Sequence, residues 1–135
     1  MTDRRGVVMA VLDPLKVSDE ATRLGIDEIA GYLQQQLGQK LTAYLAGVTD
    51  PKMVGRWAAG RARPRDEREM RLRDAFKATR MISEAFDSTT AKAWWVGSNT
   101  RLDDQAPAAV VRRAGDPDAM RFVVPAARAF AGGPA

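Results

Sequence analysis

The segment 39–64 constrains the fold of this chain more than any other, because glycine and proline divide it into two short helical units. The first unit is apolar and ends at Gly47, which can adopt the positive φ of a tight turn. The second starts after Asp50-Pro51 and ends at Gly60. Aspartate accepts hydrogen bonds from the free N–H groups of a helix start, and proline fits the first turn. The pattern predicts a helix-turn-helix, a motif that places its second helix against DNA.

The second helix of this motif has two distinct faces. Val54 and Trp57 are three residues apart and share one face, so we expect them to anchor the helix in the core. Lys52, Met53 and Arg56 then fall on the outer face. Two interpretations stay open for these residues: a DNA-binding unit, and an ordinary helical hairpin with no nucleic-acid role.

Positive charge is concentrated around this helix. The whole chain has a net charge of +4, whereas the segment 52–73 alone holds eight basic and three acidic residues. Such a cluster suits phosphate groups or an acidic protein partner. Because bases and acids alternate at helical spacing after Pro64, an ion-paired, solvated helix face is the alternative. The residues predicted to contact DNA are Lys52, Met53, Arg56, Arg61 and Arg63.

Apolar periodicity predicts helices in the rest of the chain. One stripe marks a helix over residues 19–38 and consists of Ile26, Ile29, Leu33 and Leu37. Another marks a long helix over residues 66–86 and consists of Leu72, Ala75, Phe76, Thr79, Ile82 and Phe86. Pro14 is expected to break any helix before these. We therefore expect a compact all-α protein with a weakly ordered leader (1–18), a helix-turn-helix domain with its long connecting helix (19–86), and a small helical C-terminal region (87–135).

The residue types that are missing narrow the chemistry. The chain contains no histidine and no cysteine, so the commonest general base, thiolate metal sites and disulfides are excluded. It also has no glycine-rich phosphate loop. No catalytic, metal or cofactor site is predicted, and an enzyme is the least favoured class. No apolar run reaches the 18 residues that indicate a membrane span, so no membrane partner is expected. The absence of cysteine favours the cytoplasm.

The C-terminal region is more irregular than the rest. A short helix carries Trp94 and Trp95, of which one is expected to be buried and the other partly exposed, because adjacent helical side chains point about 100° apart. A polar loop follows, then a helix that starts at Pro107 and a last helix from Pro117. Pro125 is expected to kink or split the last helix, because proline removes a helical hydrogen bond.

Two groups of residues carry a resemblance to a known family. Trp57-Ala58-Ala59-Gly60 followed by Pro64 resembles the W-x-x-G-x-x-x-P end of Xre-type helix-turn-helix domains. The C-terminal region resembles the toxin-binding domain of Xre/MbcA/ParS antitoxins through Trp94, Ser98, Asn99, Leu102, Pro107 and Val110. Together the two signatures cover about residues 25–131.

The resemblance implies an all-helical antitoxin that neutralises a RES-domain toxin, a member of a family of NAD-consuming or ADP-ribosylating enzymes. It also implies multi-copy assemblies of toxin and antitoxin. We further expect a homo-oligomer as an alternative assembly, and operator DNA as a partner through which the chain regulates its own operon. The family's C-terminal segment reaches the active-site cleft of the toxin, so the segment 117–135 is the expected inhibitory element. The residues predicted to contact the toxin are Trp95, Asn99, Arg101, Arg121, Arg128 and Phe130.

Other interpretations of the C-terminal region stay open. Asn99 is also suited to bracing its loop, and the last helix is also suited to closing the core through Phe122 and Val123. At the level of function, the alternative is a DNA-binding transcriptional repressor, for example of phage type, whose C-terminal half dimerises it and has no toxin partner.

Overall fold

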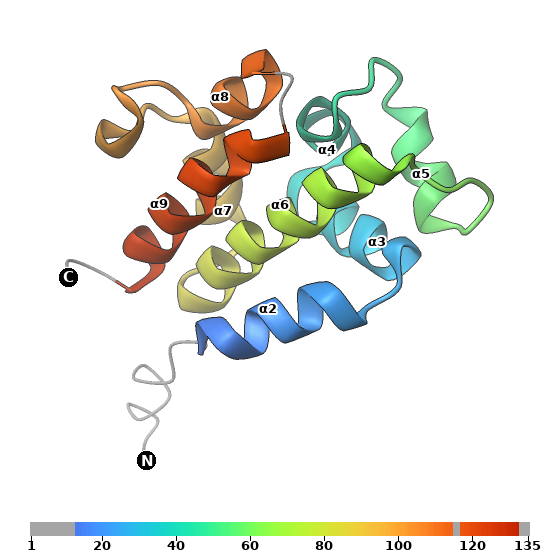
Figure 1. Cartoon of the computed structure of the whole chain (residues 1–135), viewed down its shortest axis with the longest axis horizontal. Coiled ribbons are helices and arrows are strands. Elements are labelled where there is room, and N and C mark those ends of the chain that lie inside the picture. Colours follow the sequence, from blue (N-terminus) through green and yellow to red (C-terminus); the bar gives the residue numbers. More distant parts are fainter. Residues whose placement is uncertain (1–12, 115–116, 133–135) are drawn as a thin grey trace.

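The computed structural model describes residues 13–114 and 117–132, and this part of the chain is all helical, as the sequence predicts. Eight α-helices and two short 3-10 helices follow one another, with no strand among the described residues (Figure 1). In chain order they are α2 (Pro14–Arg23), α3 (Ile26–Leu37), α4 (Gln39–Ala46), α5 (Lys52–Ala58), α6 (Asp66–Ala85), α7 (Ser88–Val96), η1 (Thr100–Leu102), α8 (Pro107–Ala114), η2 (Pro117–Ala119) and α9 (Met120–Gly132).

Helix α6 is the centre of the fold. It packs against α2, α3, α4, α7 and α9, and Figure 1 shows it crossing the molecule between α9 on one side and α3 on the other. The stripe predicted for this helix is buried from Leu72 to Ile82. Phe86, the last member of the predicted stripe, is instead 53 % exposed, because the helix ends at Ala85. One continuous apolar cluster contains side chains from every α-helix between α2 and α9.

The helix predicted over residues 19–38 is in fact two helices. Asp13 starts α2 by accepting the backbone N–H of Leu15 at 2.9 Å, and Pro14 occupies the first turn, where its missing N–H costs nothing. Helix α3 begins after Gly25, whose N–H donates to the side chain of Glu28 at 3.0 Å. The segment 14–18 is therefore helical, which corrects its assignment to the leader, and residues 1–12 lie outside the described residues.

Ionic contacts attach α2 to α6. The guanidinium of Arg73 donates to the carbonyls of Ala21 and Leu24 at 2.8 and 2.7 Å, which satisfies the C-terminal carbonyls of α2. Arg80 pairs with Glu20 of α2 at 3.1 Å and also with Glu84 of its own helix. These contacts use charges that the sequence pattern places on a solvated face.

Helix α9 lies along α6 and is a single helix. It buries Val123, Ala127 and Ala131 against the core. It continues through Pro125, so of the two expected effects of this proline, a kink or a split, the split does not occur. Among the described residues, no helix combines the length and apolar character needed to cross a bilayer.

Candidate functional site

The turn between α4 and α5 has the chemistry that the sequence predicts. Gly47 ends α4 with φ 88°, and its N–H donates to the carbonyl of Ala43 at 3.0 Å. The side chain of Asp50 accepts the backbone N–H of Lys52 at 3.0 Å and so stabilises the start of α5. Both helices pack against α3, so the turn joins two elements with a fixed mutual orientation.

Helix α5 buries one face and exposes the other, as predicted. Val54 and Trp57 are 0 % and 2 % exposed, whereas the side chains of Lys52 and Arg56 are in solvent. Met53 is partly buried and packs against the core, so it presents less surface than an outer-face position implies. The exposed face of α5 therefore offers two cations.

The arginines of the basic cluster around α5 form two groups: some are exposed to solvent, and others donate hydrogen bonds within the fold. Arg61 is exposed, and Arg63 is exposed while it pairs with Glu69 at 3.0 Å. Three other arginines of the cluster instead donate to backbone carbonyls: Arg68 to Gly47, Arg71 to Val111, and Arg73 to Ala21 and Leu24. A count of charges along the sequence does not separate these two groups, because the distinction depends on which helix packs beside α6.

The C-terminal half contacts the turn of the helix-turn-helix directly. Arg112 of α8 donates to the carbonyls of Tyr44 and Val48, each at 3.2 Å. Its guanidinium also lies 5.1 Å from the centre of the Tyr44 ring, within cation–π range. Together with Arg68, this arginine satisfies carbonyls at the C-terminal end of α4, where positive charge is favourable.

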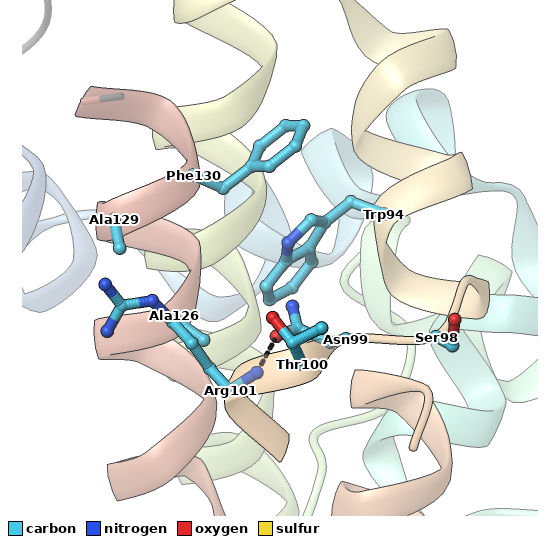
Figure 2. Close-up of a pocket in the computed structure, with 8 residues that line it drawn as sticks. All are labelled: Trp94, Ser98, Asn99, Thr100, Arg101, Ala126, Ala129 and Phe130. Atoms are coloured by element: carbon cyan, nitrogen blue, oxygen red, sulfur yellow. Dashed lines mark hydrogen bonds between the residues drawn. The ribbon is translucent and has the colours of Figure 1, made fainter. Parts of the chain in front are cut away.

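A second surface lies between the end of α7, η1 and α9. There an open hollow of about 350 Å³, here named the α9 hollow, has Trp94 on one side and the loop residues 98–101 beside it (Figure 2). Its other wall is formed by Ala126, Ala129 and Phe130 of α9. The hollow thus brings together Asn99, Arg101 and Phe130, three of the six residues predicted to contact a toxin.

Asn99 braces the loop beside this hollow. Its side-chain oxygen accepts the N–H of Arg101 at 2.9 Å, and its backbone N–H donates to the carbonyl of Gln105 at 3.2 Å. Its own carbonyl accepts the N–H of Asp104 at 2.8 Å. Asp103 and Asp104 have positive φ values of 55° and 62°, which fold the loop back on itself. The bracing interpretation of Asn99 therefore holds, although its side chain still borders the hollow.

The two tryptophans of α7 are both buried, which corrects the expected division between them. Trp95 is 0 % exposed, and its indole N–H donates to the hydroxyl of Thr79 on α6 at 3.0 Å. It is therefore a core residue and not a surface contact, because no part of its side chain reaches solvent. Trp94 is 8 % exposed and borders the α9 hollow. The indole rings are 5.2 Å apart, edge to face.

Helix α7 starts at a well-defined cap. The carboxylate of Asp87 accepts the backbone N–H of Thr90 at 2.7 Å. Hydrogen bonds from the side chain and the backbone of Thr90 stabilise the charged form and lower the pKa of Asp87 below its usual value. This cap fixes the start of the helix that carries both tryptophans.

Exposed aromatic side chains gather on the outer side of α9 and at the end of α6. Phe122 is 65 % exposed and Phe130 is 42 % exposed, and the ring of Phe130 lies 5.3 Å from that of Phe86. Phe122 therefore does not close the core, whereas Val123 does. The exposure of Phe86 and Phe122 is not predictable from the sequence pattern, because an apolar residue at a helical spacing is more often buried.

The two remaining predicted contacts, Arg121 and Arg128, are both exposed on α9. They are seven residues apart and share its solvent face, since the helix is continuous between them. Arg121 lies 4.0 Å from the carboxylate of Asp118, a distant and solvent-screened pair. The outer face of α9 therefore combines aromatic and cationic side chains.

Comparison of the chain with protein-family models, with curated proteins and with solved structures gave no match. An assignment of function therefore depends on the chemistry of the two surfaces described above.

Proposed function

We propose that this chain is the antitoxin of a type II toxin–antitoxin system, an interaction protein that binds a RES-domain toxin and covers its active site. The observation that supports this proposal most directly is the pair of exposed aromatics Phe86 and Phe130, whose rings are 5.3 Å apart, with Phe122 exposed further along α9. Large apolar side chains that gather on one exposed region are typical of protein interfaces. Aromatic and arginine residues also supply most of the binding energy at such interfaces.

The outer face of α9 suits the proposed target. A toxin that consumes NAD or transfers ADP-ribose must hold the phosphates of a dinucleotide. The proposal requires acidic side chains in the same cleft, because guanidinium groups only donate and a cationic phosphate site would repel them. Arg121 and Arg128 offer guanidinium groups on one exposed side of α9, and Phe122 is exposed on the adjacent part of the helix surface. In this proposal the arginines occupy the cleft while the aromatics bury apolar area at its rim. The family resemblance adds a multi-copy assembly, and the absence of cysteine favours a cytoplasmic location.

The proposal is tested by co-expression with a RES-type toxin encoded beside this gene. Truncation after Pro125 is a poor test, because it removes Ala127 and Ala131, which are buried in the core. The double substitution Phe122→Ala and Phe130→Ala keeps those residues and is expected to abolish protection of cells from the toxin. Met70→Ala is the control, since Met70 is 54 % exposed but lies on α6, away from α9. Full protection by the double variant, with its fold confirmed by circular dichroism, would contradict the proposal.

A second candidate function is a DNA-binding repressor without a toxin partner. It is favoured by Lys52 and Arg56, which lie exposed on the second helix of a helix-turn-helix. The two candidates differ in what the α9 face does. A repressor binds DNA through the exposed face of α5. Its repression should not change when Phe122 and Phe130 are removed, unless these residues form its dimer interface. Repression of the chain's own promoter by the double α9 variant, together with lack of any toxin binding by the natural chain, would favour this candidate.

A further inference from the structure

The α9 hollow is lined by hydrogen-bond donors. Loop residues 98–101 contribute two hydroxyls, the amide of Asn99 and the guanidinium of Arg101, and the opposite side contributes the indole of Trp94. Guanidinium and indole groups donate only, and the hydroxyls and amide can also donate. None of the described residues that line the hollow is acidic. Its chemistry is therefore complementary to an acceptor with negative charge.

Two of these donors are not used by the described part of the chain. The indole nitrogen of Trp94 is buried and has no hydrogen-bond partner there. In Figure 2 it lies on the edge of the ring that faces α9. The side chain of Arg101, directed from η1 toward α9, likewise makes no hydrogen bond or ion pair with the described residues. The indole nitrogen is shielded from solvent, whereas the guanidinium of Arg101 is exposed and open to an acceptor supplied from outside.

The walls of the hollow restrict which anion fits. Ala126, Ala129, Phe130 and the ring of Trp94 are apolar, whereas Arg101 is the single cation among the lining residues. A doubly charged phosphate in a protein site is usually held by several charged or backbone donors. One guanidinium beside apolar walls instead matches one carboxylate on a short aliphatic stem, and guanidinium pairs with carboxylate through two parallel hydrogen bonds.

We infer that the α9 hollow binds a glutamate or aspartate side chain presented by the protein partner. The carboxylate pairs with Arg101, and its methylene groups pack against Phe130 and the ring of Trp94. This inference rests on the proposed function, because it names the group of the partner that the C-terminal face recognises. It assigns Arg101 the role of charge partner and the rings of Trp94 and Phe130 the role of apolar walls.

The first test needs no partner protein. The full chain contains three tryptophans, so an ¹⁵N-labelled sample gives three indole N–H signals, and Trp94→Phe identifies the signal of Trp94. The sample is titrated with N-acetylglutamate N-methylamide, with the matching glutamine derivative and with inorganic phosphate. The glutamate probe is expected to shift the Trp94 signal and to leave that of Trp57 unchanged, while the glutamine probe shifts neither. No shift with glutamate, or a shift produced by phosphate at lower concentration, would overturn the inference.

The second test uses the partner. Arg101→Gln is expected to weaken binding of the toxin roughly 10- to 100-fold, the usual loss when a hydrogen-bonded charge is removed from an interface. Arg113→Gln, at an exposed position on α8 outside the hollow, serves as the matched control and is expected to bind normally. Equal affinity for Arg101→Gln and the natural chain would overturn the inference while the proposed function stands. If the natural chain fails to bind the toxin, the proposed function fails, and the glutamate titration alone decides on the hollow.

Discussion

The indole N–H of Trp95 donates to the hydroxyl of Thr79 at 3.0 Å, and both side chains are completely buried. This hydrogen bond joins α7 to α6 beneath the α9 hollow, so it sets the position of Trp94 on the neighbouring side of α7. A polar contact of this kind specifies a unique packing, because each group is unfavourable in the core without the other.

Removing the acceptor of this bond should destabilise the fold. Thr79→Val retains the shape of the side chain but leaves the indole N–H of Trp95 without a partner, so the free energy of unfolding should fall by about 1–3 kcal/mol. Urea unfolding monitored by circular dichroism measures the change. Thr22→Val is the control, since the hydroxyl of Thr22 bonds a carbonyl of its own exposed helix. An equal fall in the free energy of unfolding of the two variants would show that the hydrogen bond between Trp95 and Thr79 contributes no more to stability than that of Thr22.

Trp57 should be the anchor of α5. Trp57→Ala is expected to lower the free energy of unfolding by about 3–5 kcal/mol, as large aromatic truncations in cores do. Trp57→Phe should cost clearly less, because the indole nitrogen of Trp57 has no partner among the described residues and its removal loses no hydrogen bond. Thermal and urea unfolding of the two variants give the comparison. Unchanged stability in Trp57→Ala would mean that Trp57 does not anchor α5 in the core and that another face of the helix points inward.

Contact with DNA should depend on the exposed cations of α5 and the loop after it. If Lys52, Arg56, Arg61 and Arg63 neutralise phosphates, each substitution to alanine should reduce the slope of log affinity against log salt by roughly 0.9. Fluorescence anisotropy with DNA from upstream of the gene, across a salt series, measures the slope. Lys16→Ala on α2 is the control, since this exposed lysine lies outside the motif. If the natural chain shows no salt-sensitive binding to this DNA, the hypothesis that these cations contact DNA is contradicted.

Protonation of Asp87 at low pH should destabilise the start of α7, because this residue caps the helix. The pKa of Asp87 is lowered in the folded chain, so its charged form binds Thr90 and stabilises the fold at any pH above the unfolded pKa. This contribution is lost as the pH falls through the folded pKa, below the ordinary value of 3.8. Asp87→Asn keeps an acceptor but cannot titrate, so its stability should depend less steeply on pH in that window. Parallel acid titrations of thermal stability compare the two chains, and identical pH dependence would contradict the prediction.

The helix-turn-helix was predictable because its signals are local. Gly47, Asp50 and the spacing of Val54 and Trp57 determine a turn, a helix start and an inward face without reference to the rest of the chain. The same logic applied to Asp13-Pro14 would have predicted the start of α2, since that pair repeats the chemistry of Asp50-Pro51. Treating Pro14 only as a helix breaker caused the error.

The C-terminal surface was predictable only in part, because burial there depends on contacts distant in the sequence. Trp95 turns inward since Thr79, sixteen residues earlier, offers an acceptor. Phe122 turns outward since Val123 occupies the position that faces α6. Asn99, Arg101 and Phe130 were nominated for partner contact, and their meeting in one hollow depends on how α9 lies along α6.

The bonds from Arg112 to the carbonyls of Tyr44 and Val48 have a thermodynamic consequence for the two proposed binding faces. They join α8 to the turn before α5, and the shared core joins both to α9, so the described helices form one packed unit. A ligand changes affinity at a distant site by favouring one arrangement of the protein over another or by changing its conformational entropy. For one continuous packed core, we expect a coupling free energy near zero within a single copy. Cooperativity between a bound protein and bound DNA would then arise from contacts between neighbouring copies along the duplex.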